Sequence, residues 1–221
     1  MDIAYIFQSG VKDSIALRYS LRSLVNIAHD RVFLVGDKPD WVCNVIHVAV
    51  RDFNNPRFYR IRAVNTWNKI INICRTDISD DFILFNDDYF LLNKVDTIPY
   101  YYRGRVPVFR NPTGYQEMVM RSAKGFENPL HFGTHTPIVY QKSRFLDISA
   151  LYKISQGLDH KIIYCNHYKV EPVERMMDCK IRSISKFKLK GTFVSTVNKI
   201  ESDPVFEKEM NRVFPEKSKY E

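Results

Sequence analysis

The sequence lacks any long apolar run. Its uninterrupted apolar stretches are only a few residues long, whereas a helix that crosses a bilayer needs about 20 such residues. The beginning, MDIAYIFQSG, has an acid at position 2, no basic region and no small-residue cleavage site, so it does not resemble a secretory signal. We therefore expect a cytoplasmic protein with no membrane span.

Cysteine is scarce, and no linker is apparent. The four cysteines form no C-x-x-C pair and lie far apart, at Cys43, Cys74, Cys165 and Cys179. This spacing argues against a disulfide framework and a thiolate metal cluster, and we expect reduced, mostly buried thiols. No repeat, low-complexity stretch or Gly/Ser linker divides the 221 residues. Residues 1–221 are therefore predicted to form a single domain.

Acidic residues are outnumbered by basic ones. The chain has 33 Lys and Arg against 25 Asp and Glu, a net charge of +8 and a pI of about 9.2. This excess favours an anionic partner, such as a nucleotide, a nucleic acid or a phosphorylated sugar. A positive net charge also aids solubility by itself, so composition leaves the partner open.

The first 50 residues predict a βαβ unit. Residues 3–7 and 32–35 are short apolar runs followed by turn-prone segments, and residues 45–50 form a third such run. Between the first two, residues 12–28 repeat apolar side chains near a helical period, with Asp13 or Ser14 as the cap. Strand, helix and strand in this order predict an α/β fold with a parallel sheet covered by helices.

The segment 80–92, DDFILFNDDYFLL, is the most informative. An apolar run stops at Asn86, Asp87 and Asp88 and then resumes. An unpaired buried carboxylate is costly, so these acids must reach solvent, a cation or a ligand. In open α/β sheets, ligands bind beyond the carboxyl ends of the strands, which is where this triplet is expected.

Two adjacent carboxylates preceded by an amide form an all-oxygen cluster suited to Mg²⁺ or Mn²⁺. A diphosphate would complete the coordination sphere. The alternative is a solvated acidic turn. The preceding helix, predicted over residues 59–73, could present Arg62, Asn65 or Lys69 to phosphate oxygens, or could simply expose these residues to solvent.

The second half of the sequence is less regular. The Tyr- and Arg-rich residues 100–105 could stack on bases or sugars, or pack as an edge strand. His135, with His131 nearby, is a candidate proton carrier, and Asp159 beside His160 is a candidate general base. Helices are predicted around residues 146–153 and over residues 202–214, and residues 186–191 form a basic amphipathic patch.

These motifs together resemble the nucleotide-diphospho-sugar transferases of the GT-A type. The resemblance rests on DIAYIFQSG, LRYSLRSLVNIAHDRVFLVGDKPDWV and FILFNDDYFLL, with support from residues 135–137, 166–168 and 215–221. Within that group the chain is most similar to Stealth-type sugar-phosphate transferases and small phage-encoded glycosyltransferases. The resemblance implies a Rossmann-like mixed sheet flanked by helices, with residues 1–95 binding the nucleotide sugar and residues 96–221 binding the acceptor.

For the donor half, the resemblance implies a UDP-sugar or related nucleotide sugar and a Mn²⁺ or Mg²⁺ ion at Asp87 and Asp88. Gln8 and Ser9 would contact the nucleotide, and Asp37 would contact the ribose or base. Arg62 and Asn65 would bind the donor phosphates.

For catalysis, His135 is the first choice for a group near the acceptor hydroxyl, with Asp159 and Asp88 as further catalytic candidates. The leading hypothesis is a metal-dependent glycosyltransferase with an anionic acceptor, such as a hydroxymethylated base in phage DNA. The alternatives are a Stealth-like transfer of sugar 1-phosphate to a polysaccharide, and a non-catalytic polyanion-binding domain.

Overall fold

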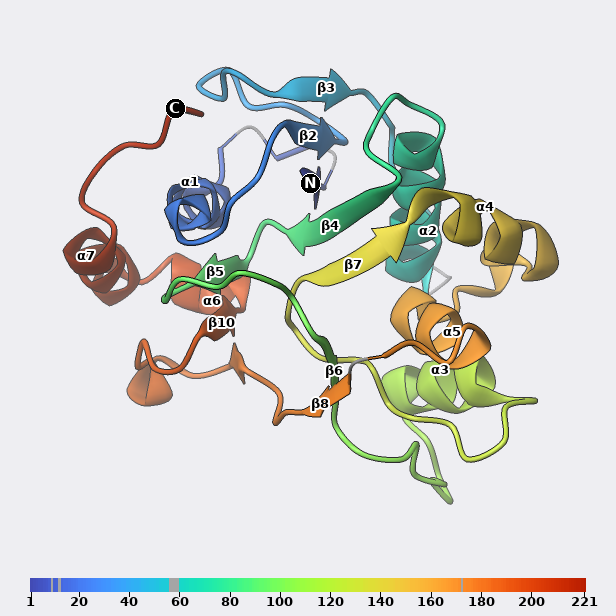
Figure 1. Cartoon of the computed structure of the whole chain (residues 1–221). Coiled ribbons are helices and arrows are strands. Elements are labelled where there is room, and N and C mark those ends of the chain that lie inside the picture. The colour runs from blue at the N-terminus through green and yellow to red at the C-terminus, as the bar shows by residue number, and fades with distance from the viewer. Residues whose placement is uncertain (9, 12, 56–59, 172) are drawn as a thin grey trace.

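A central sheet of five strands organises the computed structural model, which describes residues 1–8, 10–11, 13–55, 60–171 and 173–221. The strands are β1 (Asp2–Ile6), β2 (Val32–Val35), β3 (Ile46–Val48), β4 (Asp81–Asn86) and β7 (Ile138–Gln141), and their order is β3-β2-β1-β4-β7. The first four run parallel, and β7 is antiparallel to β4, as their opposed arrows show (Figure 1). The predicted α/β fold with a mixed, helix-flanked sheet is confirmed.

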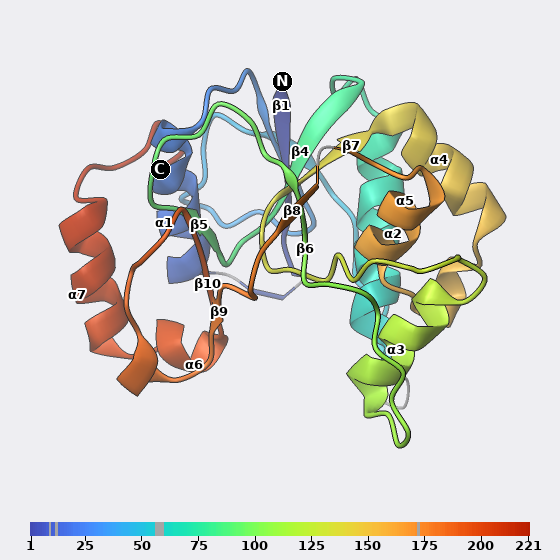
Figure 2. The ribbon, with the colours of Figure 1, turned by 60° about the horizontal axis from the view of Figure 1, so that its bottom comes forward.

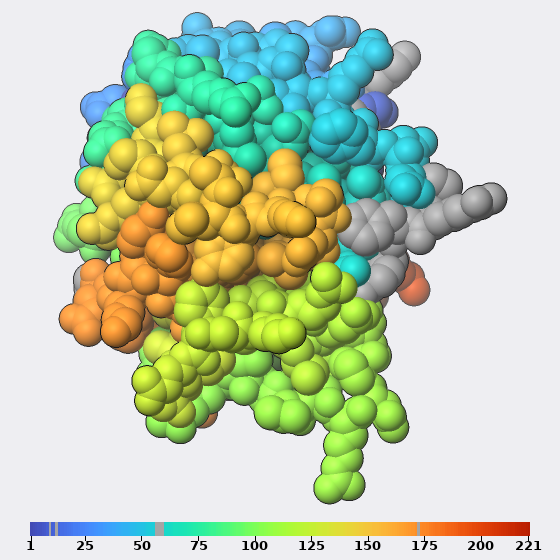
Figure 3. Space-filling view, turned by 90° about the vertical axis from the view of Figure 1, so that its right-hand side faces the viewer, coloured from blue at the N-terminus to red at the C-terminus, as the bar shows by residue number. Residues whose placement is uncertain are grey.

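Both faces of the sheet are buried, because successive side chains of a strand point to opposite faces. Ala4 and Phe82 belong to a core with Trp67, whereas Ile3 and Ile83 belong to another core around α1. Figure 2 shows α2 (Ile61–Cys74), α4 (Lys142–Leu151) and α5 (His160–His167) on one side and α1 (Ile15–Ser23) on the other. In Figure 3, the yellow segment with α4 and the lime-green segment with α3 (Gly114–Ala123) form one continuous surface.

Smaller elements complete the fold around the central sheet. A three-stranded sheet has the order β5-β10-β9, formed by β5 (Tyr89–Leu91), β10 (Phe193–Thr196) and β9 (Lys180–Ile181). A two-stranded sheet pairs β6 (Tyr100–Tyr102) with β8 (Val173–Arg175). The last helices are α6 (Asn198–Glu201) and α7 (Pro204–Val213), and short 3₁₀ turns cover Leu24–Asn26, Ile154–Gln156 and Ile184–Lys186.

The helix boundaries differ from the sequence-based expectations in several places. Helix α1 is shorter than residues 12–28, because Ser14 caps it and a 3₁₀ turn replaces its end. Asp13 instead accepts a hydrogen bond from the indole of Trp41. Helix α4 begins before the expected residue 146. Helix α7, capped by Asp203 with proline in its first turn, is confirmed.

No helix among the residues that the structure describes is both long enough and apolar enough to cross a membrane. This agrees with the shortness of the apolar runs in the sequence.

Candidate active site

The site lies where the strand order reverses. After β1 the chain forms β2 and β3 on one side of it, then returns to form β4 on the other side. Ile6 and Asn86 are partners in the register of β1 and β4, so the two strands end at the same level. Such a switch point, where neighbouring loops separate, is where open α/β sheets bind ligands.

A cavity of about 920 Å³ opens at this point. Its walls come from the loop after β1, residues 52–54, the start of α2, the turn after β4, Lys180 and α6. Five of the predicted site residues line it: Gln8, Arg62, Asn65, Asp87 and Asp88. Ser9 lies outside the described residues.

Asp87 and Asp88 have different surroundings within the turn. Burial, together with the negative charges of Asp88 and Glu201, raises the pKa of Asp87 to about 7. Asp88 is satisfied by neighbours: its Oδ2 accepts hydrogen bonds from Lys180 over 2.5 Å and from Ser195 over 2.9 Å. Burial also raises the pKa of Glu201, whose carboxylate accepts a hydrogen bond from Thr196.

The cavity has more acidic than basic side chains. Five acids line it, against three bases. Two of the bases, Lys69 and Lys180, form ion pairs with Asp52 and Asp88. Arg62 makes no hydrogen bond or ion pair with any described residue, so its guanidinium is available to a ligand. A polyanion would therefore meet net negative charge here unless a cation accompanied it.

Helix α2 holds the loops around the cavity. Lys69 is buried and donates hydrogen bonds to the Phe7 carbonyl over 2.6 Å, besides its contact with Asp52. Of the two alternatives for Lys69, exposure to solvent is therefore wrong, because its buried ammonium holds the loop after β1 in place. Asn65 accepts a hydrogen bond from the Phe53 amide and donates one to the Phe53 carbonyl. Asn65 thus lines the cavity while its amide fixes residues 52–54.

A second cavity, of about 560 Å³, shares Gly10 and Val11 with the first. Asp37 lines this second cavity, and its carboxylate accepts a hydrogen bond from the Gly10 amide over 2.6 Å. The end of β2 and the loop after β1 are thereby joined. The two cavities together extend from the acids after β4 to the end of β3.

The residues present fit a divalent cation only in part. Within the described ranges, no three His, Cys, Asp or Glu side chains lie close enough to hold a metal ion by themselves. Asp87 and Asp88 would supply two carboxylates. Mg²⁺ is commonly bound by one or two carboxylates, with water and substrate phosphates as the other ligands. The site therefore suits a cation that arrives with, or is completed by, a phosphorylated ligand.

His135 and Asp159 are not among the residues that line the main cavity. His135 Nδ1 lies 2.6 Å from the Asp178 carboxylate. Burial opposes ionisation of Asp178, but the His135 hydrogen bond and the Arg182 contact hold its pKa below its usual range. Asp159 caps α5 by accepting hydrogen bonds from the Lys161 and Ile162 amides.

Two further histidines lie away from the cavity, of which His131 is buried and His160 is half-buried. His160 lies 2.5 Å from the Tyr140 hydroxyl, and burial lowers its pKa to about 4. Burial also lowers the pKa of His131, whose ring packs against Tyr115. Both rings therefore favour the neutral form.

Sequence reasoning missed three side chains at the acids: Lys180, Ser195 and Glu201. They come from β9, β10 and α6, and each is about 90 residues or more from the Asn-Asp-Asp triplet in the chain. No spacing in the sequence connects them with the triplet. The pairing of β9 and β10 with β5, the strand that follows the triplet, brings Lys180 and Ser195 there, and α6 with Glu201 follows β10.

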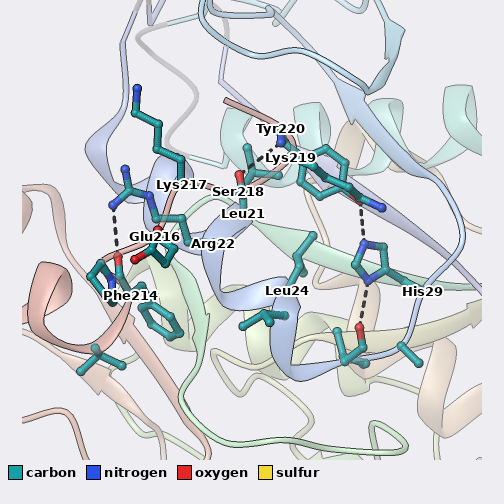
Figure 4. A pocket seen from close by; sticks show the side chains of 15 residues that line it. Leu21, Arg22, Leu24, His29, Phe214, Glu216, Lys217, Ser218, Lys219 and Tyr220 are labelled. Atoms are coloured by element: carbon teal, nitrogen blue, oxygen red, sulfur yellow. Dashed lines mark hydrogen bonds between the residues drawn. The ribbon is translucent and has the colours of Figure 1, made fainter.

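A further cavity, of about 650 Å³, lies between α1 and the last residues of the chain. Figure 4 shows a hydrogen bond between Tyr220 and His29, and another from Arg22 to the Phe214 carbonyl. None of the predicted site residues lines it, and its wall is mainly apolar. It is therefore a weaker candidate for an active site than the cavity beside the acids.

Comparisons with known proteins give only distant likenesses. Neither a family model nor a curated protein matches the sequence. A solved structure of the galactosyltransferase LgtC in complex with donor and acceptor sugar analogues matches with a TM-score of 0.48, and one of an active-site mutant of LgtC with 0.46. Each is 10% identical and covers 96% of this chain and 83% of the other. At these values the likeness says nothing of what this chain acts on.

Proposed function

We propose that the chain is a metal-dependent glycosyltransferase that moves a sugar from a nucleoside-diphosphate sugar to an acceptor hydroxyl. One observation carries the proposal: Asp87 and Asp88 stand beside a large cavity at the switch point between β1 and β4. Open α/β sheets bind nucleotides at such points. The acidic lining favours a diphosphate that binds together with a cation.

In this proposal Asp87 and Asp88 hold Mn²⁺ or Mg²⁺, which supplies Lewis-acid charge to the departing diphosphate. Arg62 donates hydrogen bonds to the donor phosphates, since its guanidinium has no partner among the described residues and lines the same cavity. The second cavity, beside Asp37, is large enough to accommodate a nucleoside. Gln8 and Ser9, in the loop between the two cavities, contact the nucleotide, and Asn65 positions the opposite wall.

The acceptor half, residues 96–221, supplies the remaining groups. His135 is the candidate for the acceptor hydroxyl, because Asp178 orients its ring and lies two residues from Lys180, which lines the cavity. Asp159 remains a candidate general base through the carboxylate oxygen that does not cap α5. In this proposal the chain acts as one domain, with donor and acceptor meeting at Asp88.

An anionic acceptor, such as a hydroxymethylated base in phage DNA, is supported by the segment after β9. Arg182, Lys186, Lys188 and Lys190 are all exposed there. The same segment favours a second candidate function, polyanion binding without catalysis. In either case affinity for DNA would fall steeply with added salt, because phosphate contacts release counterions.

The test is a screen of nucleotide sugars with Mn²⁺, with and without acceptor, in which the nucleotide product is identified. Release of nucleoside diphosphate supports glycosyl transfer, whereas release of nucleoside monophosphate indicates the Stealth-like sugar-phosphate transfer. The variant with both Asp87→Ala and Asp88→Ala should lose about 10³-fold in rate, or about 4 kcal/mol of transition-state stabilisation. Full metal-dependent activity in that variant would exclude the site. DNA binding with no metal-dependent nucleotide binding would favour the non-catalytic function.

A further inference from the structure

The ammonium group of Lys180 is already in contact with one of the two proposed metal ligands. Lys180 Nζ lies 2.5 Å from Asp88 Oδ2, and the Ser195 hydroxyl donates to the same oxygen. Only 17% of the Lys180 side chain and 15% of the Asp88 side chain are exposed. The contact is therefore largely shielded from solvent, and charges interact more strongly there than on an open surface.

The three elements in this contact are far apart in sequence. Asp88 lies in the turn between β4 and β5, Ser195 in β10 and Lys180 in β9. The Lys180 side chain also lines the main cavity, so it faces the space that a ligand would enter. An ion pair formed only to staple the strands together would not need to face that space.

A divalent ion and the Lys180 ammonium cannot both take the same Asp88 oxygen. A ligating carboxylate oxygen lies about 2 Å from Mg²⁺, and an ammonium held on that oxygen would be strongly repelled by the ion. Metal binding through this oxygen therefore requires the ammonium to move away. Lys has a flexible four-carbon stem, and its neighbouring cavity offers room for such a movement.

We propose that Lys180 is an internal counter-cation that competes with the divalent ion for Asp88. In the metal-free protein it neutralises a largely buried carboxylate whose other hydrogen-bond donor, the Ser195 hydroxyl, carries no charge. When metal binds, the ammonium is released toward the cavity. This inference rests on the metal site of the proposed function. It adds a residue, Lys180, whose competition lowers the affinity of that site for the metal.

The experiment measures Mn²⁺ affinity of the full chain by titration calorimetry, without nucleotide. Lys180→Gln keeps a hydrogen-bond donor for Asp88 but removes the charge, and is expected to bind Mn²⁺ at least tenfold more tightly than the wild type. Arg62→Gln is the matched control, because it removes one positive charge from the same cavity without touching Asp88. A much smaller gain is expected for it. Asp88→Asn should lose the gain when combined with Lys180→Gln.

Each outcome decides something. Equal or weaker Mn²⁺ binding by Lys180→Gln, with measurable binding by the wild type, overturns the competition but leaves the metal site intact. An equal gain for Arg62→Gln also overturns it, because the effect would then be a general one of charge. No Mn²⁺ binding by any variant at millimolar metal, either alone or with a nucleoside diphosphate added, removes the metal site itself. If Lys180→Gln folds poorly, the increase in its melting temperature with added Mn²⁺ is compared with that of the wild type, and a larger increase supports the proposal.

Discussion

The Arg22 guanidinium donates two hydrogen bonds to the Glu221 carboxylate, 199 residues away in sequence. Nε lies 2.7 Å from Oε1, and Nη2 lies 2.9 Å from Oε2. Only 9% of the Arg22 side chain and 2% of the Glu221 side chain are exposed. Arg18, also in α1, donates to the same carboxylate. This two-pronged contact fastens the end of the chain to α1.

Replacing Glu221 by Gln is expected to lower the free energy of unfolding by about 3 kcal/mol, because a largely buried arginine loses its partner. The measurement is urea denaturation at pH 7. The pH dependence gives an independent check. Burial opposes ionisation of Glu221, but hydrogen bonds from Arg22 and Ser218 lower its pKa to about 2. Its contribution is therefore complete above the ordinary pKa of about 4.5 and is lost as the pH falls toward 2. An unchanged stability at pH 7 would contradict the prediction.

Protonation of His160 is expected to lower the stability of the fold at a higher pH than protonation of Glu221 does. Burial lowers the pKa of His160 to about 4. The negative charge of Asp159 acts to raise this pKa, and the positive charge of Lys161 acts to lower it. The unfolded state therefore binds a proton near pH 6.5, while the folded state resists it. The free energy of unfolding is expected to fall by up to about 1.4 kcal/mol per pH unit between pH 6.5 and pH 4 because of this residue.

The check on His160 compares the wild type with His160→Gln by chemical denaturation at several pH values. The substitution costs some packing at every pH, so the slope between pH 6.5 and pH 4 is the informative quantity. A shallower slope in the variant is expected. Parallel curves for the two proteins would show that His160 does not carry the effect.

Removal of the Arg62 guanidinium is expected to weaken donor binding. Its guanidinium lines the main cavity without a partner among the described residues, and a bidentate contact with phosphate is lost in Arg62→Met. We expect KM for the nucleotide sugar to rise about tenfold, or about 1.4 kcal/mol, with little change in the melting temperature. Arg75→Gln, at the exposed far end of the same helix, is the control and should leave KM unchanged. An unchanged KM in Arg62→Met would remove Arg62 from the donor site.

At Gly36, after the end of β2, the backbone leaves no room for a larger side chain. Its φ is +125°, and an added Cβ would lie 2.1 Å from the Phe7 carbonyl oxygen. Gly36→Ala is therefore expected to destabilise the fold by at least about 3 kcal/mol. Gly191→Ala separates the two causes, because Gly191 has a φ of +81° but nothing within 4 Å of its Cβ position. It should cost only about 1–2 kcal/mol. Similar losses in both variants would show that contact with Phe7 is not the cause.

Local sequence signals predicted much of the sheet. The apolar runs before Gln8, Gly36 and Asn86 are β1, β2 and β4, and they are readable because a strand buried on both faces needs consecutive apolar residues. Helix α7 was equally readable from its cap and proline. Helix α3 was missed, although Thr113 and Gln116 form a capping box that the sequence displays. Of the two alternatives for Lys69, exposure to solvent was wrong, because an amphipathic pattern does not reveal that a lysine ammonium is buried.

The sequence by itself determined that a pair of acids follows a buried strand at the ligand-binding edge of an α/β sheet, since apolar patterning and the cost of burying charge act locally along the chain. Only the tertiary structure decided what those acids meet. Lys180 is 92 residues from Asp88 and Ser195 is 107 residues away. Their contact depends on strand pairing between β9, β10 and β5, which no local pattern encodes. The charge balance of the cavity is therefore a property of the packed sheets and not of any one segment.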